Sequence, residues 1–322
     1  MPRPRFPKTL FEFQEWFPTE RSCMEYLIQC RWPDGFVCPK CSSTRSPWLV
    51  ETRRMVQCPD CRRQTFLTAY TIMEGTRTPL RIWFYAAFHI ATHTPGFSAV
   101  QLQRELGIKR YETAFNILHK LRSAMIRPDR DKIHGLVEVD ETYIGGPKSG
   151  KRGRGAEGKS IAIGAIEVLG KTERRKRAGR LRLCIIPNVQ GRTLISFVKQ
   201  NVEPRSNVQT DDWQGYDGLS TAGYRHQIVG NKELLRIHHT FGNLKTWLKG
   251  THHGVSAKHL QAYVNEFVFR HNRRHTPMAA FQTVLGLAVH AQGPTYEQLY
   301  AAGKQGGWVH PKRPLRSLSR TG

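Results

Sequence analysis

The chain has 322 residues, enough for two or three domains of ordinary size. Lysine and arginine number 50 against 25 acidic residues, which gives a formal net charge of +25. Such a charge favours a polyanionic partner, and nucleic acid is the expected one; a solvated basic surface without a specific partner is the alternative. No apolar run approaches the roughly 20 residues of a membrane span, and the N-terminus lacks a signal-peptide core. We therefore expect a cytoplasmic protein with no membrane partner.

Four of the seven cysteines form two C-x-x-C pairs. Cys38 and Cys41 stand in CPKC, Cys58 and Cys61 in CPDC, and sixteen residues separate the pairs. This spacing is typical of a zinc ribbon, in which four thiolates close a tetrahedral site without an open position. We expect structural Zn²⁺ in an N-terminal domain of one helix and the ribbon, residues 1–70. The helical register of Cys23 and Cys30 favours positions in the core, with a second metal site as the alternative, and Cys184 is expected to be a buried strand residue.

Residues 71–132 have a helical pattern with one break at a Pro-Gly pair. After the break Ser98 can cap a short helix, Gly107 can supply a turn, and residues 111–125 can form a second amphipathic helix. This order matches the helix-turn-helix pattern of DNA-binding proteins, and an ordinary helical hairpin is the alternative. Basic side chains favour contact with DNA phosphates: Lys109, Arg110, Lys120 and Arg122.

From residue 133 the periodicity changes to that of strands. Three alternating segments predict an antiparallel meander, and a helical run and a fourth strand follow. The segments are GLVEVDETYIGG at 135–146, KSIAIGAIEVLG at 159–170, GRLRLCIIPN at 179–188, the helix at 192–202 and NVQTDDWQGY at 207–216. This is the order of an α/β ribonuclease-H-like domain with a mixed sheet, expected over residues 133–276.

In that order the first and fourth strands are neighbours, so Asp140 on the first and Asp211 after the fourth face each other. Two facing carboxylates repel unless divalent cations neutralise both. Oxygen ligands select Mg²⁺ or Mn²⁺, and a pair of such ions suits phosphoryl transfer. We expect a catalytic metal site at these two residues; the alternative is that each acidic cluster is a solvated strand end.

Several motifs together carry a family resemblance. They are the two C-x-x-C pairs, SAVQLQRELGI at 98–108, VDETYIGG at 139–146, QTDDWQGY at 209–216 and HHTFGNLKTWLKGTHHGVSAKHLQAYVNEFVFRHNRR at 238–274. With them the chain resembles the bacterial insertion-sequence transposases of the ISXO-like family, which join an N-terminal zinc ribbon to a DDE-type catalytic domain. The resemblance extends to about Pro277, and residues 277–322 are expected to form a C-terminal extension and a basic tail.

The resemblance implies an enzyme that acts on DNA. It would bind the terminal inverted repeats of its own element, cleave strands with two metal ions and transfer 3'-hydroxyl ends into a target. Its partner would be double-stranded DNA in the bacterial cytoplasm, at the nucleoid. Pairing two DNA ends implies a homodimer or a higher assembly.

The resemblance also assigns site residues. Asp140 corresponds to the first acidic ligand of the family and Asp211 to the second, with Asp212 as the competitor of Asp211. Many relatives place the third acid, a glutamate, seven residues before a lysine or arginine, which is two turns of one helix face. Here Lys245 fits the basic position, where it would approach a phosphate oxygen or the terminal bases, but the residue seven before it is His238.

The third ligand therefore has several candidates. His238 can bind a metal as neutral imidazole and Asn243 can offer an amide oxygen; we favour His238. The carboxylate alternatives are Glu233 and Glu266. The change from glutamate to histidine opens two other functions: a transposase-derived DNA-binding protein without catalysis, and a nuclease that cuts without joining.

Overall fold

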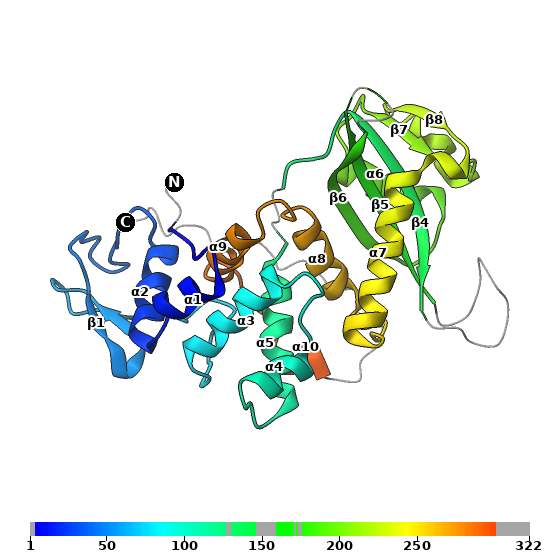
Figure 1. Cartoon of the computed structure of the whole chain (residues 1–322). Coiled ribbons are helices and arrows are strands. Elements are labelled where there is room, and N and C mark those ends of the chain that lie inside the picture. The colour runs from blue at the N-terminus through cyan, green and yellow to red at the C-terminus, as the bar shows by residue number, and fades with distance from the viewer. Residues whose placement is uncertain (1–3, 127–129, 146–158, 171, 173–175, 301–322) are drawn as a thin grey trace. The chain divides into compact units, whose positions relative to one another are not determined.

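The structure is a computed structural model of the whole chain, and it describes residues 4–126, 130–145, 159–170, 172 and 176–300 (Figure 1). The chain divides into two units, Met1–Pro128 with Arg273–Gly322, and Asp129–Asn272. The C-terminal helices thus belong to the unit that contains the N-terminus, whereas the sequence set 277–322 apart as an extension. The four-part division made from the sequence stays a prediction, and the expected basic tail from residue 301 lies outside the described residues.

The first unit begins with two short helices, α1 (Leu10–Trp16) and α2 (Glu20–Arg31). The side chain of a threonine, Thr9 or Thr19, accepts a hydrogen bond at the start of each helix, which fixes both N-termini. The apolar face of α2 is buried and includes Cys23 and Cys30, which confirms their prediction as core residues.

A three-stranded antiparallel sheet follows, with strand order β1-β2-β3. Its strands are β1 (Trp48–Val50), β2 (Met55–Gln57) and β3 (Gln64–Phe66), and the 3₁₀ turn η1 (Glu51–Arg53) joins the first two. Met55 and Val56 of the central strand are buried. The sheet therefore has its own small apolar core and joins the two cysteine pairs.

The rest of the first unit is helical. Its helices are α3 (Leu80–Thr92), α4 (Ala99–Glu105), α5 (Tyr111–Ala124), α9 (Pro277–Ala288) and α10 (Tyr296–Tyr300). Ser98 caps α4 by accepting the N–H of Gln101, and Gly107 has φ +61° in the turn before α5. The local predictions for this segment are therefore confirmed. In the core, Phe281 of α9 packs among the rings of Phe13, Phe17, Phe84 and Phe88.

The second unit is built on a mixed five-stranded sheet of order β6-β5-β4-β7-β8. The strands are β4 (Leu136–Ile144), β5 (Ser160–Leu169), β6 (Arg177–Ile186), β7 (Asn207–Thr210) and β8 (Arg225–Ile228). The first three are antiparallel, and β7 and β8 run parallel to β4. The predicted meander and the adjacency of the first and fourth strands are confirmed, while β8 was not anticipated.

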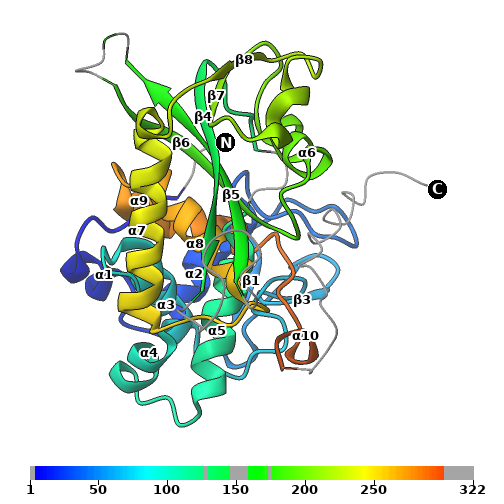
Figure 2. The same ribbon diagram turned by 90° about the vertical axis from the view of Figure 1, so that its right-hand side faces the viewer.

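Helices cover both faces of this sheet (Figure 2). On one face α6 (Gly191–Asn201) and the 3₁₀ helix η3 (Gln214–Leu219) pack on a cluster that includes Val137 and Val139. On the other face lie α7 (Leu235–His252), which follows the short η4 (Asn231–Glu233), and α8 (Leu260–His271). Cys184, predicted to be buried, is partly buried against the first cluster.

A glycine allows α7 to lie close to the sheet. A Cβ built on Gly164 of β5 would meet Leu183 Cδ2 at 2.7 Å, Ile237 Cδ1 at 2.8 Å and Phe241 Cε1 at 3.0 Å. Two of these atoms belong to α7, so a larger residue here would push the helix away. Gly164 pairs with Asp140 across β4 and β5, and the close approach therefore occurs beside the central acid of the site.

Candidate zinc site and active site

The four predicted cysteine ligands form one cluster. Their sulfur atoms all lie within 4.8 Å of one another, with Cys38 Sγ 3.5 Å from Cys61 Sγ and Cys41 Sγ 3.7 Å from Cys58 Sγ. Around a tetrahedral Zn²⁺ with Zn–S bonds of about 2.3 Å, sulfur atoms are about 3.8 Å apart. The cluster therefore fits the size of a four-thiolate zinc site.

Both cysteine pairs have the same local backbone. The N–H of Ser42 donates to the carbonyl oxygen of Cys38 at 3.0 Å, and the N–H of Arg62 donates to that of Cys58 at 3.1 Å. Ser42 and Arg62 have φ of 57° and 60°, which closes each turn. Although burial opposes it, backbone N–H groups of Cys41 and Lys40 lower the pKa of the Cys38 thiol to about 6. These two N–H groups thus favour the thiolate form of Cys38, which is the form that binds zinc.

The acids of β4 have different surroundings because neighbouring residues of a strand face opposite sides. Glu138 and Asp140 face the side of α7, and both are buried, with relative exposures of 1% and 9%. Glu141 faces the other side, where its Oε2 accepts a hydrogen bond of 2.8 Å from the hydroxyl of Tyr216. The cluster noted in the sequence is therefore three carboxylates with three separate sets of partners.

Asp140 lies against the first turn of α7. Its Oδ2 is 2.9 Å from Nε2 of His238, and its Oδ1 accepts the N–H of Glu141 at 2.8 Å. Burial raises the pKa of the Asp140 carboxyl to about 6, with the charge of Glu141 adding to the rise and His238 opposing it. Ionisation of a buried carboxyl group costs free energy, so a cation bound beside Asp140 would stabilise its carboxylate form.

Asp211 directly follows β7, the strand beside β4, and lies next to the part of β4 that holds Asp140. The last register pair of β4 and β7 is Glu138 with Gln209, and Asp140 and Asp211 each follow it by two residues. Asp211 Oδ1 accepts the N–H of Trp213 at 3.2 Å, and its side chain is partly buried, whereas Asp212 is exposed. Asp211 is therefore the better placed of the two adjacent acids.

Tyr216 marks where these acids converge, and it was missed by the sequence reasoning. Its pKa is raised well above the ordinary value, by burial first and then by the charges of Glu141, Asp140 and Asp211. Strand β4 and the loop after β7 thus place three carboxylates within electrostatic range of one buried phenol. The only signal in the sequence was the aromatic end of QTDDWQGY, which is equally typical of a core residue.

Helix α7 contributes a histidine and a lysine. His238 is in its first turn with 32% of the side chain exposed, and Lys245 is two turns on along the same face. Partial burial and the charge of Lys159 lower the pKa of Lys245, and the Asp140 carboxylate opposes that shift. Asp140 therefore contacts His238 directly and is close enough for its charge to affect Lys245.

The remaining candidates for a third ligand lie elsewhere. Asn243 is exposed and about 140° around the helix from His238, given 100° per residue. Glu233 is exposed and accepts the N–H of Gly230 at 3.3 Å. Glu266 is fully buried on α8, with Arg270 Nη1 at 3.7 Å. Of the residues weighed from the sequence, His238 is the one that contacts Asp140.

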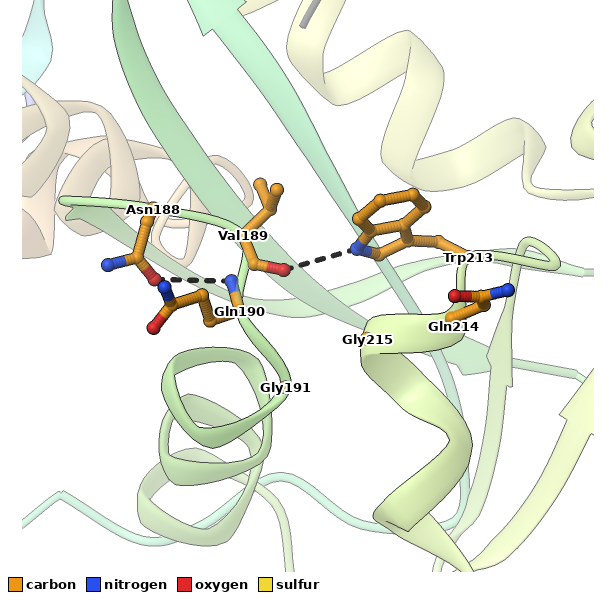
Figure 3. A pocket seen from close by; sticks show the side chains of 7 residues that line it. All are labelled: Asn188, Val189, Gln190, Gly191, Trp213, Gln214 and Gly215. Atoms are coloured by element: carbon orange, nitrogen blue, oxygen red, sulfur yellow. Dashed lines mark hydrogen bonds between the residues drawn. The ribbon is translucent and has the colours of Figure 1, made fainter. Parts of the chain in front are cut away.

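A pocket lies next to Asp211, between the start of α6 and η3 (Figure 3). Its walls are the segments Asn188–Gly191 and Trp213–Gly215, whose side chains are all uncharged. Trp213 Nε1 donates to the carbonyl oxygen of Val189 at 3.1 Å and fixes one wall against the other. Because the backbone N–H of Trp213 also binds Asp211, this wall and the acid are held together.

The basic residues of the helical segment are only partly available. Lys109 and Arg110 are exposed at the start of α5 and, with Arg77, line a depression of about 340 Å³. Arg122 is only 1% exposed and Lys120 is partly buried. The expectation that Arg122 contacts phosphate is therefore wrong, because its guanidinium lies in the core.

The four-cysteine cluster beside a three-stranded sheet is that of a zinc ribbon, and the second unit adds buried acids on a mixed five-stranded sheet. Residues 132–272 match the ISXO2-like transposase domain, and residues 18–64 match the transposase zinc-ribbon domain. The chain belongs to the insertion-sequence transposases that carry this pair of domains, as the sequence motifs indicated.

Two relatives agree with this assignment. An uncharacterized protein in transposable element ISH50 of Halobacterium salinarum is 28% identical over 295 residues, which cover 85% of this chain and 98% of the relative. An uncharacterized transposase-like protein of Haemophilus influenzae is 28% identical over 97 residues, 27% of this chain and 77% of the relative. A simian T-cell lymphotropic virus intasome in complex with PP2A regulatory subunit B56 gamma has a chain with a TM-score of 0.28 and 15% identity, covering 70% of this chain and 76% of that one; this likeness carries no argument.

In the part of the chain that the structure describes, helices with enough length and apolar character to cross a membrane are absent.

Proposed function

We propose that the protein is a DDE-type transposase with a ribonuclease-H-like catalytic domain, which binds the terminal inverted repeats of its element and performs strand cleavage and strand transfer. The observation that carries the proposal is the contact of 2.9 Å between Asp140 and His238 at the sheet edge that Asp211 also reaches. Two carboxylates and an imidazole from three elements converge there in a chain of net charge +25. Bound metal ions would neutralise these acidic side chains, which explains how they can lie beside a bound polyanion in a basic protein.

Two carboxylates and an imidazole are side chains whose chemistry suits a divalent metal. Asp140, Asp211 and His238 would hold it, and the buried Asp140 carboxylate, whose pKa is raised, has the most to gain from a cation. Two oxygen donors suit Mg²⁺, and the imidazole makes Mn²⁺ an equally good occupant. When bound, the metal pair lowers the pKa of the attacking water or 3'-hydroxyl and stabilises the leaving oxygen.

The other residues would act on the DNA. Lys245 presents an ammonium group beside Asp140, where it can bind a phosphate oxygen of the strand end. Lys109 and Arg110, exposed at the start of α5, can contact phosphates if α4 and α5 work as a helix-turn-helix. The zinc ribbon would be held together by Zn²⁺ and supply further basic side chains. A homodimer or larger assembly on paired DNA ends and a cytoplasmic, nucleoid-associated location stay predictions of the same proposal.

Strand-transfer assays test this function. Purified protein, labelled element-end DNA and a plasmid target are combined with Mg²⁺ or Mn²⁺, and the parent is compared with Asp140→Ala and Asp211→Ala. The proposal expects joined products from the parent and none from either variant. A parent that cleaves but never joins would be the nuclease that the sequence left open.

One observation favours a second candidate, a transposase-derived DNA-binding protein without catalysis. His238 stands where many relatives have glutamate, and a protonated His238 would pair with Asp140 and supply the charge that a metal otherwise provides. Tight binding of element ends by the parent, with no cleavage in either metal, would establish this candidate.

A further inference from the structure

The start of α7 is held by an acid from the sheet. Leu234, the residue before the helix, has an apolar side chain and cannot cap it. Instead Glu138 Oε2 accepts the N–H of Arg236 at 2.8 Å and the N–H of Ile237 at 2.9 Å. These are two of the N–H groups that an α-helix leaves without intrahelical partners. A carboxylate is the favoured partner there because helix N-termini carry partial positive charge.

The second carboxylate oxygen of Glu138 also lies close to α7. This oxygen, Oε1, lies 3.6 Å from Nη1 of Arg236, and the side chain is 1% exposed. The carboxylate is thus occupied by α7 on both oxygens. It is not available as a metal ligand, although it stands only two residues from Asp140 on the same face of β4.

The two acids contact consecutive parts of the same helix. Glu138 holds the backbone of residues 236 and 237, and the next residue, His238, places Nε2 against Asp140. Residues two apart on one strand face are about 6.8 Å apart, so β4 meets the first turn of α7 at two points. The close packing of Ile237 and Phe241 at Gly164 limits the helix from the β5 side.

We propose that Glu138 is a positioning residue for the reaction: by capping α7 it fixes the rotation and depth of the helix, and so the place of the His238 imidazole beside Asp140. The inference rests on the proposed function, whose metal site includes His238. A tilt of the first turn would move the imidazole while leaving the fold and the DNA-binding residues in place. Outer residues that orient metal ligands commonly contribute factors of about 10 to 100 to metal affinity or activity.

The chain offers a matched control in Glu167. Glu167 is also buried, at 4% exposure, accepts the N–H groups of His134 and Arg180 at 3.1 Å each, and binds the Arg180 guanidinium at 2.6 Å. Its partners belong to β6 and to the segment before β4. Glu138→Gln and Glu167→Gln therefore make the same chemical change in the same sheet, but only the first touches α7.

The experiment compares the two variants in the zinc-loaded, full-length protein. Affinity for Mn²⁺ is measured by electron paramagnetic resonance, element-end binding by titration, cleavage in Mg²⁺ by gel assay, and stability by thermal unfolding. We expect Glu138→Gln to weaken Mn²⁺ affinity and cleavage by about 10- to 100-fold with unchanged DNA affinity. Glu167→Gln should lose comparable stability and keep parental Mn²⁺ affinity and cleavage. Equal losses in both variants, or an unchanged Glu138→Gln, would overturn the proposal.

A double variant separates positioning from general stability. In a His238→Ala background, Glu138→Gln should cause no further loss of Mn²⁺ affinity, because its effect passes through the imidazole. If Glu138→Gln lowers Mn²⁺ affinity further in the His238→Ala background, its effect does not pass through the imidazole, and the proposal is contradicted. If Glu138→Gln does not fold, Glu138→Asp takes its place, because it keeps the charge but withdraws the oxygens by one methylene. This variant should show the same loss of Mn²⁺ affinity. Parental Mn²⁺ affinity in Glu138→Asp rejects the proposal. A parent without cleavage would refute the proposed function alone, since the Mn²⁺ affinities still decide this inference.

Discussion

The zinc ribbon and the acidic site, where we propose a second metal, are assembled in opposite ways. The ribbon draws its ligands from two tight turns with nearly identical hydrogen bonds, Cys38–Cys41 and Cys58–Cys61. The acidic site takes Asp140 from a strand, Asp211 from 71 residues later and His238 from 98 residues later. The ribbon depends on local backbone geometry, whereas the acidic site depends on the whole fold of the second unit. Loss of a ligand should therefore unfold the zinc ribbon, whereas a change near the acidic site should misplace its side chains.

The largest effect is expected from removing a zinc ligand. Cys58→Ser should release zinc and unfold the three-stranded sheet, because structural zinc in small modules contributes about 10 to 16 kcal/mol. The second unit has no part in this site and should keep its NMR spectrum. Zinc content and the dispersion of amide signals measure both. Cys184→Ser, a thiol outside the ribbon, is the control, and retention of zinc by Cys58→Ser would contradict the assignment.

A smaller but catalytic effect is expected from Asp140→Asn. The variant keeps the shape of the side chain and removes its charge, so strand cleavage should fall by about 10³-fold or more, as when one member of a catalytic set is lost. The ribbon should keep its zinc. Cleavage rates and zinc content are measured together. Parental cleavage by this variant would show that Asp140 is not part of the reacting site.

The raised pKa of Asp140 predicts a pH effect on the metal-free protein. Its folded pKa, about 6, lies above its ordinary value of 3.8, so the protonated form stabilises the fold and that contribution is lost as pH rises through 6. Between pH 5 and pH 7.5 this is worth about 1 to 1.5 kcal/mol of unfolding free energy. Urea unfolding of the second unit should show this difference against Asp140→Asn. Parallel curves for the two proteins would mean that the carboxyl titrates at its ordinary pKa.

An effect of similar size is expected from Tyr216→Phe. The change removes the hydrogen bond to Glu141 and leaves that carboxylate short of a partner, which should cost about 1 to 2 kcal/mol. Tyr224→Phe is a fair comparison, since Tyr224 is buried in the same core and its hydroxyl donates to a backbone carbonyl at 3.1 Å. Tyr216→Phe should also slow cleavage, and Tyr224→Phe should not. Similar cleavage rates for both would limit Tyr216 to a structural role.

Much of the architecture could be predicted because it follows from local patterns. The alternation of Val137 and Val139 with Glu138 and Asp140 predicted a strand, and the meander-helix-strand order predicted that β4 and β7 are neighbours. Cysteine spacing predicted the zinc cluster. Each of these inferences uses residues close in sequence or a topological rule that leaves few choices.

What could not be predicted depends on partners far away in sequence. The role of Glu138 as the cap of α7 could not be read from the sequence, because the N–H groups that it accepts lie almost 100 residues later. The charge of Arg122 suggested a DNA contact, and helix periodicity gave no sign that a C-terminal helix, α9, packs against α5. The choice between His238 and Asn243 also needed the contact with Asp140. Side-chain partners of this kind are set by tertiary packing rather than by propensity.

The central claim is that Asp140, Asp211 and His238 form one metal site, and the most direct test compares the two residues that the sequence left open. Strand transfer with Mn²⁺ is measured for His238→Ala and Asn243→Ala, with Mn²⁺ affinity determined on the same preparations. The account predicts that His238→Ala loses both joined products and Mn²⁺ affinity, while Asn243→Ala keeps both. The reverse outcome, with His238→Ala active and Asn243→Ala inactive, would contradict the site described here.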